Sequence, residues 1–252
     1  MKTVLVIGAH PDDETMLAGG TLALLSRQGW QVHILCATRG EGGEIGDPPV
    51  CRREELAAVR EQELRCAAQA LGAVDVQFMG YVDPLVGPDE ELYPFEADFE
   101  TLVGEIGAAI ERTGADLVIS HGSDGEYGHP AHRLLHQAVS EAVSRLKPPP
   151  LFYTFAAAVP GIEDHIWNHS EIAHLALDVR PWLDVKEEAA LCHRSQHALF
   201  VRRRRAETVR EVLRTIESFR RHTPPVEGDS PNDAFAALLL AAGAWPVRGE
   251  QS

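Results

Sequence analysis

Cysteine is scarce in this chain, and no two cysteines form a CxxC pair. The four cysteines lie far apart, at positions 36, 51, 66 and 192. This spacing argues against a zinc ribbon and against a fold held together by disulfides. We therefore expect free thiols, with Cys36 and Cys66 acting as small core residues in apolar segments.

Basic residues and long apolar runs are lacking as well. The chain has 23 Lys and Arg against 38 Asp and Glu, which gives a formal net charge of -15. Such a charge repels nucleic acid and anionic membranes, so we expect neither as a partner and predict a small-molecule substrate instead. The opening residues MKTVLVIGAH contain only a short apolar run. We expect no signal peptide and no spanning helix, and we predict a cytoplasmic protein.

What the sequence does contain is a regular alternation of strand and helix patterns. A length of 252 residues with 44% apolar residues is ample for a buried core. We expect strands at residues 3–7, 31–37, 74–79 and 116–120, and helices at 15–27, 52–71, 95–112. This order predicts an α/β fold, with a Rossmann-like, mostly parallel sheet flanked by helices. Ligands of such sheets bind at the carboxyl ends of the strands.

The second part of the chain changes in character after residues 148–150, which are all proline. We expect strands at 151–155 and 174–179, helices at 185–193 and 201–221, and an apolar helix from residue 235. We treat residues 1–252 as a single domain, with a C-terminal helical extension from about residue 201. The last helix could pack on the core or on another subunit, so a homo-oligomer is among the expected partners.

Two titratable clusters follow predicted strands and should open onto the same sheet edge. In GAHPDDE, His10 and Asp13 are three residues apart at the turn from a strand into a helix. In GHPAHR, His129 and His132 have the same spacing, and Pro130 suits the first turn of a helix. Two imidazoles and one carboxylate suit a zinc ion with one coordination position left for water.

The remaining side chains of the two clusters can move protons. Asp12 neighbours Asp13 but points elsewhere in a turn, so it could take a proton from water, and the spare histidine could donate a proton or steady an oxyanion. HPDD alone could equally be a loop with a helix cap. A dinucleotide-binding G-x-G-x-x-G motif is excluded because it needs glycine where His10 stands.

These residues carry a family resemblance. Residues 9–14 match [AG]HPDDE and residues 129–132 match HPxH, so the chain resembles the PIG-L/LmbE-like N-acetylglucosaminyl deacetylase family. TRGEGGEIG from Thr38, the segment around Arg60 and GYVD from Gly80 also look similar, and the likeness covers residues 1 to about 200. It implies an LmbE-like deacetylase fold.

The resemblance also implies roles for individual residues. The implied zinc ligands are His10, Asp13 and His132, with one Zn²⁺ per chain; the implied general base is Asp12, and the implied electrophilic or acid histidine is His129. Arg60 and Asp83 look like substrate-pocket or supporting residues, and Tyr127 looks like a mobile active-site tyrosine. Many members have aspartate where this chain has Ala131, so a contact from that position to a ligand histidine is not expected here.

Two further groups of residues have competing interpretations. His193 and His197 could bind a metal, but no carboxylate accompanies them and a polar helix end explains them better. The four arginines at 202–205 could attract an anionic substrate group such as malate or phosphate, although a solvated helix face paired with Glu207 and Glu211 is the simpler interpretation.

The predicted function is that of a zinc-dependent N-deacetylase. It would remove the acetyl group from an N-acetylglucosamine-type glycoconjugate, such as a bacillithiol- or mycothiol-type precursor, and release acetate and a free amine. Two alternatives stay open: an amidase of thiol S-conjugates or antibiotic-like glycosides, and a metal-bound protein that hydrolyses nothing.

Overall fold

The strands of the first 155 residues form a parallel sheet. The computed structural model describes residues 1–164, 166–228 and 230–247. Within this part of the chain the strands are β1 (Thr3–Gly8), β2 (Gln31–Thr38), β3 (Asp75–Tyr81), β4 (Leu117–Ser120), β5 (Leu151–Phe155), β6 (Ala157–Ala158), β7 (Asn168–Ile172), β8 (Leu175–Asp178), β9 (Ile216–Thr223) and β10 (Trp245–Pro246). The first five pair in parallel, in the order β3-β2-β1-β4-β5.

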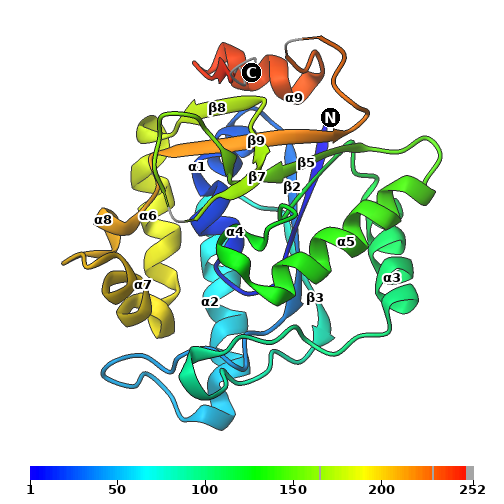
Figure 1. The fold of residues 1–252 in the computed structure, drawn as a ribbon. Coiled ribbons are helices and arrows are strands. Elements are labelled where there is room, and N and C mark those ends of the chain that lie inside the picture. The colour runs from blue at the N-terminus through cyan, green and yellow to red at the C-terminus, as the bar shows by residue number, and fades with distance from the viewer. Residues whose placement is uncertain (165, 229, 248–252) are drawn as a thin grey trace.

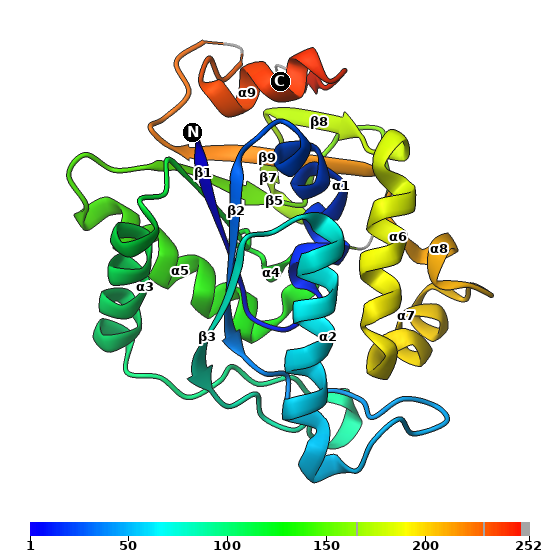
Figure 2. The ribbon, with the colours of Figure 1, turned by 180° about the vertical axis from the view of Figure 1, so that it is seen from behind.

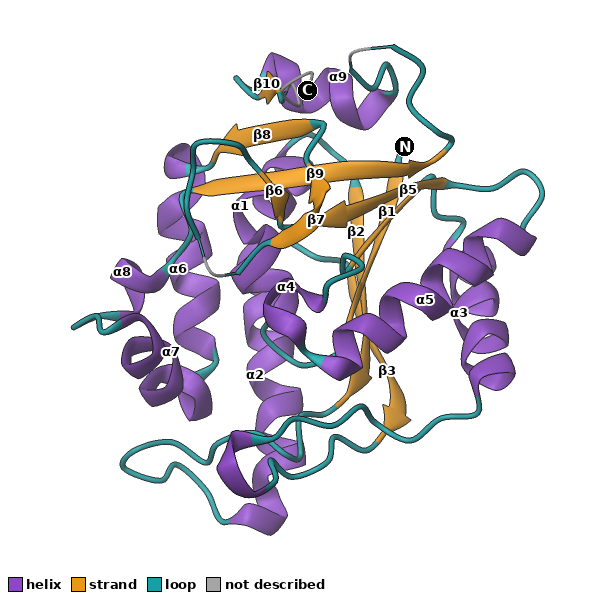
Figure 3. Cartoon of the chain, in the orientation of Figure 1, coloured by secondary structure: helices purple, strands orange, loops and turns teal. Residues whose placement is uncertain are grey.

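The later strands extend this sheet beyond β5 with antiparallel pairing. β9 pairs antiparallel with β5, β8 with β9 and β10 with β8, while β6 and β7 form a separate small sheet. Among the described residues the main sheet thus has eight strands, of which five are parallel (Figure 3). The prediction of a mostly parallel, Rossmann-like sheet is confirmed.

Helices cover both faces of the sheet. In the described residues they are α1 (Asp13–Arg27), α2 (Leu56–Leu71), α3 (Phe99–Thr113), α4 (Gly125–Gly128), α5 (Pro130–Arg145), α6 (Leu183–Cys192), α7 (His197–Arg204), α8 (Val209–Val212) and α9 (Ala234–Ala241). Figures 1 and 2 show α1, α2 and α6 gathered on one side of the sheet and α3 and α5 on the other. None of the helices in the described chain combines the length and apolarity that a membrane crossing requires.

The alternation of side chains along β1 explains why the sheet has two cores. Val4 and Val6 pack in one cluster with residues of α1 and α2, whereas Leu5 and Ile7 pack in another with residues of α3 and α5. Successive residues of a strand point to opposite faces, so an uninterrupted apolar run suits a strand that is covered on both sides.

Close packing explains the paired glycines of α1. A Cβ atom at Gly20 would lie 2.5 Å from Cβ of Val179, which is closer than such atoms can approach. The absence of a side chain at Gly20 therefore lets α1 pack closely against Val179.

The helix predicted over residues 201–221 is wrong in its second half. α7 ends at Arg204, α8 is one turn, and Ile216–Thr223 is a strand between β5 and β8. The charged residues of this strand find partners inside the fold: Glu217 lies 2.7 Å from Lys186, and Arg221 lies 2.9 Å from Asp233. The segment from about residue 201 is thus not a purely helical extension.

The expectation of four free thiols is also wrong. Cys66 of α2 and Cys192 of α6 form a disulfide, although 126 residues separate them in the sequence. The two helices lie side by side, which brings the Cα atoms within 5.7 Å of each other. Cys36 and Cys51 are free.

Candidate active site

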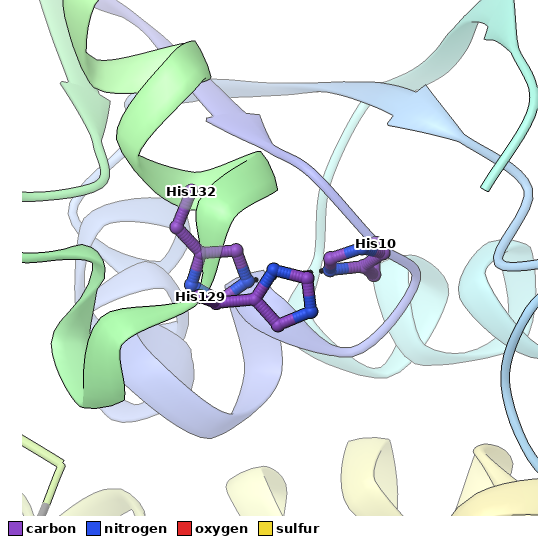
Figure 4. A group of neighbouring side chains, drawn as sticks. All are labelled: His10, His129 and His132. Carbon is purple, nitrogen blue, oxygen red and sulfur yellow. Dashed lines mark hydrogen bonds between the residues drawn. The ribbon is translucent and has the colours of Figure 1, made fainter. Parts of the chain in front are cut away.

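The candidate site forms at the point where the order of the parallel strands reverses, beside β1. After β1 the chain continues through α1 to β2 on one side, whereas β4 and β5 lie on the other side of β1. Loops at such a switch point separate and leave room for a ligand at the carboxyl ends of the strands. The turn from His10 to Asp13 follows β1, and the turn that ends at α5 follows β4. Figure 4 shows His10 facing His129 and His132 across this gap.

Three predicted ligand residues meet at one point. Nε2 of His132 lies 3.2 Å from Nδ1 of His10 and 3.4 Å from Oδ1 of Asp13, and Nδ1 of His10 lies 3.7 Å from Oδ2 of Asp13. A tetrahedral zinc site with bonds of about 2.0–2.1 Å has ligand atoms about 3.3 Å apart. The three side chains therefore fit a zinc ion, and His10, His129 and His132 form a second group close enough to share a metal.

Charge at this point favours a metal cation. All three residues are buried. Burial alone would raise the pKa of Asp13, but His132 and His121 more than offset it and hold that pKa well below its usual range. Burial, followed by the charge of His121, lowers the pKa of His132 and favours the neutral imidazole that a metal requires.

Glu126 orients His132, one of the candidate metal ligands. No pattern in the sequence pointed to Glu126. Its Oε2 accepts hydrogen bonds from Nδ1 of His132 at 2.6 Å and from Nδ1 of His121 at 2.9 Å. Because Nδ1 of His132 is engaged, Nε2 is left to face His10 and Asp13. Glu126 thus supplies the second contact that Ala131 cannot make.

His121 is the other residue that was missed. It is fully buried between two carboxylates, with Nε2 lying 3.2 Å from Oδ2 of Asp13. Burial opposes its charge, but Glu126 and Asp13 raise the pKa of His121 to about 10. A protonated ring can donate to both carboxylates and fix their positions. The only hint in the sequence was the density of polar residues between β4 and His129.

Asp12 lies beside the point where His10, Asp13 and His132 meet, and its backbone conformation is unusual. Its φ of 130° is one that residues with a side chain rarely adopt. Burial raises the pKa of Asp12 to about 6, although Arg60 acts to lower it. Arg60 is only 2% exposed; its Nη2 donates to Oδ2 of Asp12 at 3.1 Å and to the Pro11 carbonyl at 2.5 Å. Arg60 therefore holds both the backbone of the turn and the carboxylate of Asp12 in place.

A glycine loop makes room for Arg60. Gly40 has φ of 69°, and a Cβ atom there would lie 2.1 Å from Nη1 of Arg60. Nη1 also donates to the Gly40 carbonyl at 3.1 Å. The TRGEGGEIG segment thus packs around the arginine because it lacks side chains at this position.

His129 begins α5 and is held by the helix terminus. Its Nδ1 accepts a hydrogen bond from the Ala131 amide at 3.2 Å, so the ring hydrogen resides on Nε2. Burial, followed by the neighbouring His132 and His10, lowers the pKa of His129 and keeps the ring neutral. The ring stacks on His132 at a centroid distance of 4.6 Å.

The two other predicted substrate residues also lie at this point. Oδ1 of Asp83 is 3.2 Å from Nε2 of His10, and Oδ2 accepts from the Gly42 amide. Tyr127 is 41% exposed and sets its ring edge-on to His129 and His132. The structure thus brings all eight predicted site residues together around two adjoining hollows.

The His193/His197 pair does not join this cluster. Neither residue belongs to the metal-capable groups found among the described residues. Nε2 of His193 instead faces Glu14 at 3.4 Å, and Nε2 of His197 faces the Ala190 carbonyl. Of the arginines at 202–205, Arg202 pairs with Glu44 and Arg204 with Asp164, not with the glutamates expected.

Comparison with known proteins places this site in a family. Residues 5–143 match the family model described as PIG-L, GlcNAc-PI de-N-acetylase. The chain is 33% identical over 225 residues to a probable N-acetyl-α-D-glucosaminyl L-malate deacetylase 2 of Bacillus anthracis, covering 86% of this chain and 91% of that one. It is 29% identical to a 1D-myo-inositol 2-acetamido-2-deoxy-α-D-glucopyranoside deacetylase of Acidothermus cellulolyticus, covering 79% and 81%.

Solved structures share the fold. The 4-carboxy-2-hydroxymuconate hydratase GalB of Pseudomonas putida superposes with a TM-score of 0.62 at 24% identity, covering 92% of this chain and 100% of that one. The N,N'-diacetylchitobiose deacetylase of Pyrococcus horikoshii superposes with a TM-score of 0.61 at 20% identity, covering 88% and 84%. The family match spans both histidine clusters and the sheet between them, and the chain belongs to the PIG-L/LmbE family of N-acetylglucosaminyl deacetylases.

Proposed function

We propose that this chain is a zinc-dependent hydrolase that removes the N-acetyl group from an N-acetylglucosamine conjugate. The observation that supports this most strongly is the meeting of His10, Asp13 and His132 beside a carboxylate that is not used as a ligand, Asp12. Zinc bound at that point would act as a Lewis acid toward the amide carbonyl and the attacking water.

Asp12 is the proposed general base. Arg60 fixes one carboxylate oxygen of Asp12, so the other is free to accept a proton from the attacking water. Burial raises the pKa of Asp12 to about 6, which makes the carboxylate a better proton acceptor than an exposed one. After the amide bond breaks, the same carboxyl group can return the proton to the amine.

His129 is proposed to stabilise the oxyanion as a hydrogen-bond donor. The Ala131 amide occupies Nδ1, which leaves the hydrogen on Nε2, the nitrogen that can face the site. Since burial lowers the pKa of His129, the neutral ring donates a hydrogen bond and does not transfer a proton. His129 is thus proposed as the electrophilic residue, and Asp12 is proposed as the acid.

The finer assignments rest on the relatives. Two of them are named for conjugates of N-acetylglucosamine, one with malate and one with inositol. We propose the same class of small-molecule substrate here, with Arg60, Asp83 and Tyr127 at its binding site. A cytoplasmic location, a single working domain over residues 1–252 and a homo-oligomer are likewise proposals.

The test replaces Asp12 by asparagine. Asp12→Asn should retain one zinc per chain and lose acetate release by about 10²-fold or more, because only the base is removed. Zinc content and acetate release from N-acetylglucosaminyl malate are the measurements. Asp184→Asn, a change on the exposed face of α6, is the matched control.

Two outcomes would contradict the proposal. Unimpaired acetate release by Asp12→Asn would remove Asp12 from the role of base. A wild-type protein that binds zinc but cleaves no amide would favour the metal-bound, non-catalytic alternative.

A further inference from the structure

Two hollows meet at the candidate site. A small polar hollow of about 100 Å³ is lined by His10, Asp83 and Gln196, among other residues. A large hollow of about 400 Å³ also reaches Asp12 and Asp13. Because these two aspartates line both hollows, a bond held beside them has room for a different group on each side.

The large hollow has apolar walls and several cations. Its apolar lining consists of Met16, Leu17, Ile166, Leu199, Phe200 and Val212. Arg203, Arg204 and Arg214 line it too, and among the described residues Glu90 is the only carboxylate there besides Asp12 and Asp13. A cluster of three arginines is unusual for a molecule with a net charge of -15.

One of these arginines is not neutralised by a neighbouring carboxylate. Arg204 forms an ion pair with Asp164 at 3.0 Å. The guanidinium of Arg203 lies 5.5 Å from the ring centre of Tyr127, and it forms no ion pair with any described residue. Arg203 lines both hollows, so its free charge stands where they join.

Arg214 has an unused donor within the protein. Its side chain is 5% exposed, stacks on Trp167 at 3.9 Å, and donates from Nη1 to the Ile166 carbonyl at 2.9 Å. Nε is 3.7 Å from Asp164. Nη2 is buried and has no hydrogen-bond partner among the described residues. An unsatisfied buried donor is unfavourable, the more so when it is charged, so a ligand group that accepts from it gains affinity.

We propose that the large hollow binds an anionic, non-sugar part of the substrate, with Arg203 and Nη2 of Arg214 as its donors. The inference rests on the proposed function, because it places the scissile amide beside Asp12. A neutral hydrocarbon chain would leave the Arg203 charge without a counter-ion and Nη2 of Arg214 without an acceptor. A carboxylate or a phosphate accepts from both and satisfies them.

The test compares amide hydrolysis, measured as the free amine released, between charged and neutral conjugates. The probes are N-acetylglucosaminyl malate, N-acetylglucosamine 1-phosphate, the neutral N-acetylglucosaminyl inositol and N-octanoylglucosamine. We expect Arg203→Gln to lower kcat/KM for an anionic probe roughly tenfold to a hundredfold, chiefly through KM, and to change it for the neutral probes by less than about twofold. Comparing malate with phosphate identifies the anion.

Two further variants complete the design. Arg214→Lys keeps a charge but removes Nη2, and it should weaken the same anionic probe while the protein stays folded. Arg205→Gln removes an equal charge two residues from Arg203, outside both hollows, and should behave as wild type. An equal loss for charged and neutral probes in Arg203→Gln overturns the proposal, and so does a wild-type preference for the octanoyl probe.

Binding separates this inference from the proposed function. If wild-type protein releases free amine from none of the probes, the proposed deacetylase function fails. Calorimetric titration of the same probes then still decides the inference. Tighter binding of an anionic probe that is lost in Arg203→Gln supports an anion site, and equal binding of charged and neutral probes rejects it.

Discussion

Glu126 holds side chains of the candidate metal site in place without belonging to the predicted ligand set. It accepts hydrogen bonds from two imidazoles, those of His121 and His132, and its Oε1 accepts from the Gly122 amide and from Asn168. It reaches them from a backbone conformation with φ of 61°, next to Gly125 with φ of 68°. Strain of this kind persists only where the surroundings hold it in place.

Removing the charge of Glu126 should weaken metal binding. In Glu126→Gln the amide presents either an N–H toward His132 or a weaker acceptor, so the ring is held less firmly. We expect zinc affinity to fall roughly tenfold to a hundredfold, measured by competition with a chelator. Glu105→Gln, at the surface, is the control. Unchanged affinity would mean that the helix start alone positions His132.

His174 provides a pH-dependent contribution to stability. Burial lowers the pKa of His174 from 6.5 to about 4, and its Nδ1 accepts from the Arg221 amide. The unfolded chain therefore takes up this proton first as the pH falls. The contribution is fully present above pH 6.5 and is lost as the pH falls toward 4.

Denaturant unfolding at two pH values tests this. Because His174 is only partly buried, we expect wild type to lose about 1 kcal/mol relative to His174→Asn between pH 7 and pH 5. His169→Asn, on the exposed side of β7, should show no such change. A constant difference between wild type and His174→Asn would contradict the assignment.

At the scale of elements, most of the strands and helices could be predicted, including those near residues 175, 185 and 235, but the strand β9 could not. Apolar runs such as Val4 to Ile7 fix buried strands, because few other structures bury every side chain. β9 carries Glu217, Arg220 and Arg221, which local patterns assign to a solvated helix. Their partners come from α6, from β7 and from the residue before α9, and sequence spacing does not reveal such pairs.

The ion pair between Lys186 and Glu217 should be essential to the stability of β9 and its packing on α6. Both side chains are fully buried, and Glu217 also accepts from the amides of Gly20 and Thr21. Lys186→Met leaves a buried carboxylate without its cation, which costs about 3–5 kcal/mol in the free energy of unfolding. Arg145→Met, which removes an exposed pair with Glu100, should cost at most about 1 kcal/mol.

The candidate site was predictable to a similar degree. The i, i+3 spacing in HPDD and HPAH predicted that His10 and Asp13 meet one histidine of the second pair, because strand ends share one edge. The family resemblance singled out His132 as that histidine. The supporting contacts of Glu126 and His121 were not predictable, since they depend on a turn whose backbone no local pattern specifies.

At the scale of the whole molecule, the disulfide joins two helices that the sequence separates widely. Cys66 and Cys192 link α2 to α6. Disulfides persist in oxidising compartments and are rare in the cytoplasm. The pairing of Cys66 with Cys192 therefore argues against the proposed cytoplasmic location.

Thiol counting tests the pairing. Denatured but unreduced protein should alkylate at Cys36 and Cys51 alone, and at four positions after reduction, as read by mass spectrometry. Reduction should lower the free energy of unfolding by about 2–4 kcal/mol. Four reactive thiols without reductant, in protein isolated from its native host, would show that the pair is reduced there.

The position of β9 constrains how the molecule can be made. β9 fills the gap between β5 and β8, yet it is translated more than sixty residues after β5. On the ribosome the growing polypeptide therefore exposes the open edge of β5 until residue 223 has left the exit tunnel. Chaperone contact during synthesis is to be expected at that edge, and a message truncated before β9 would yield an aggregating product.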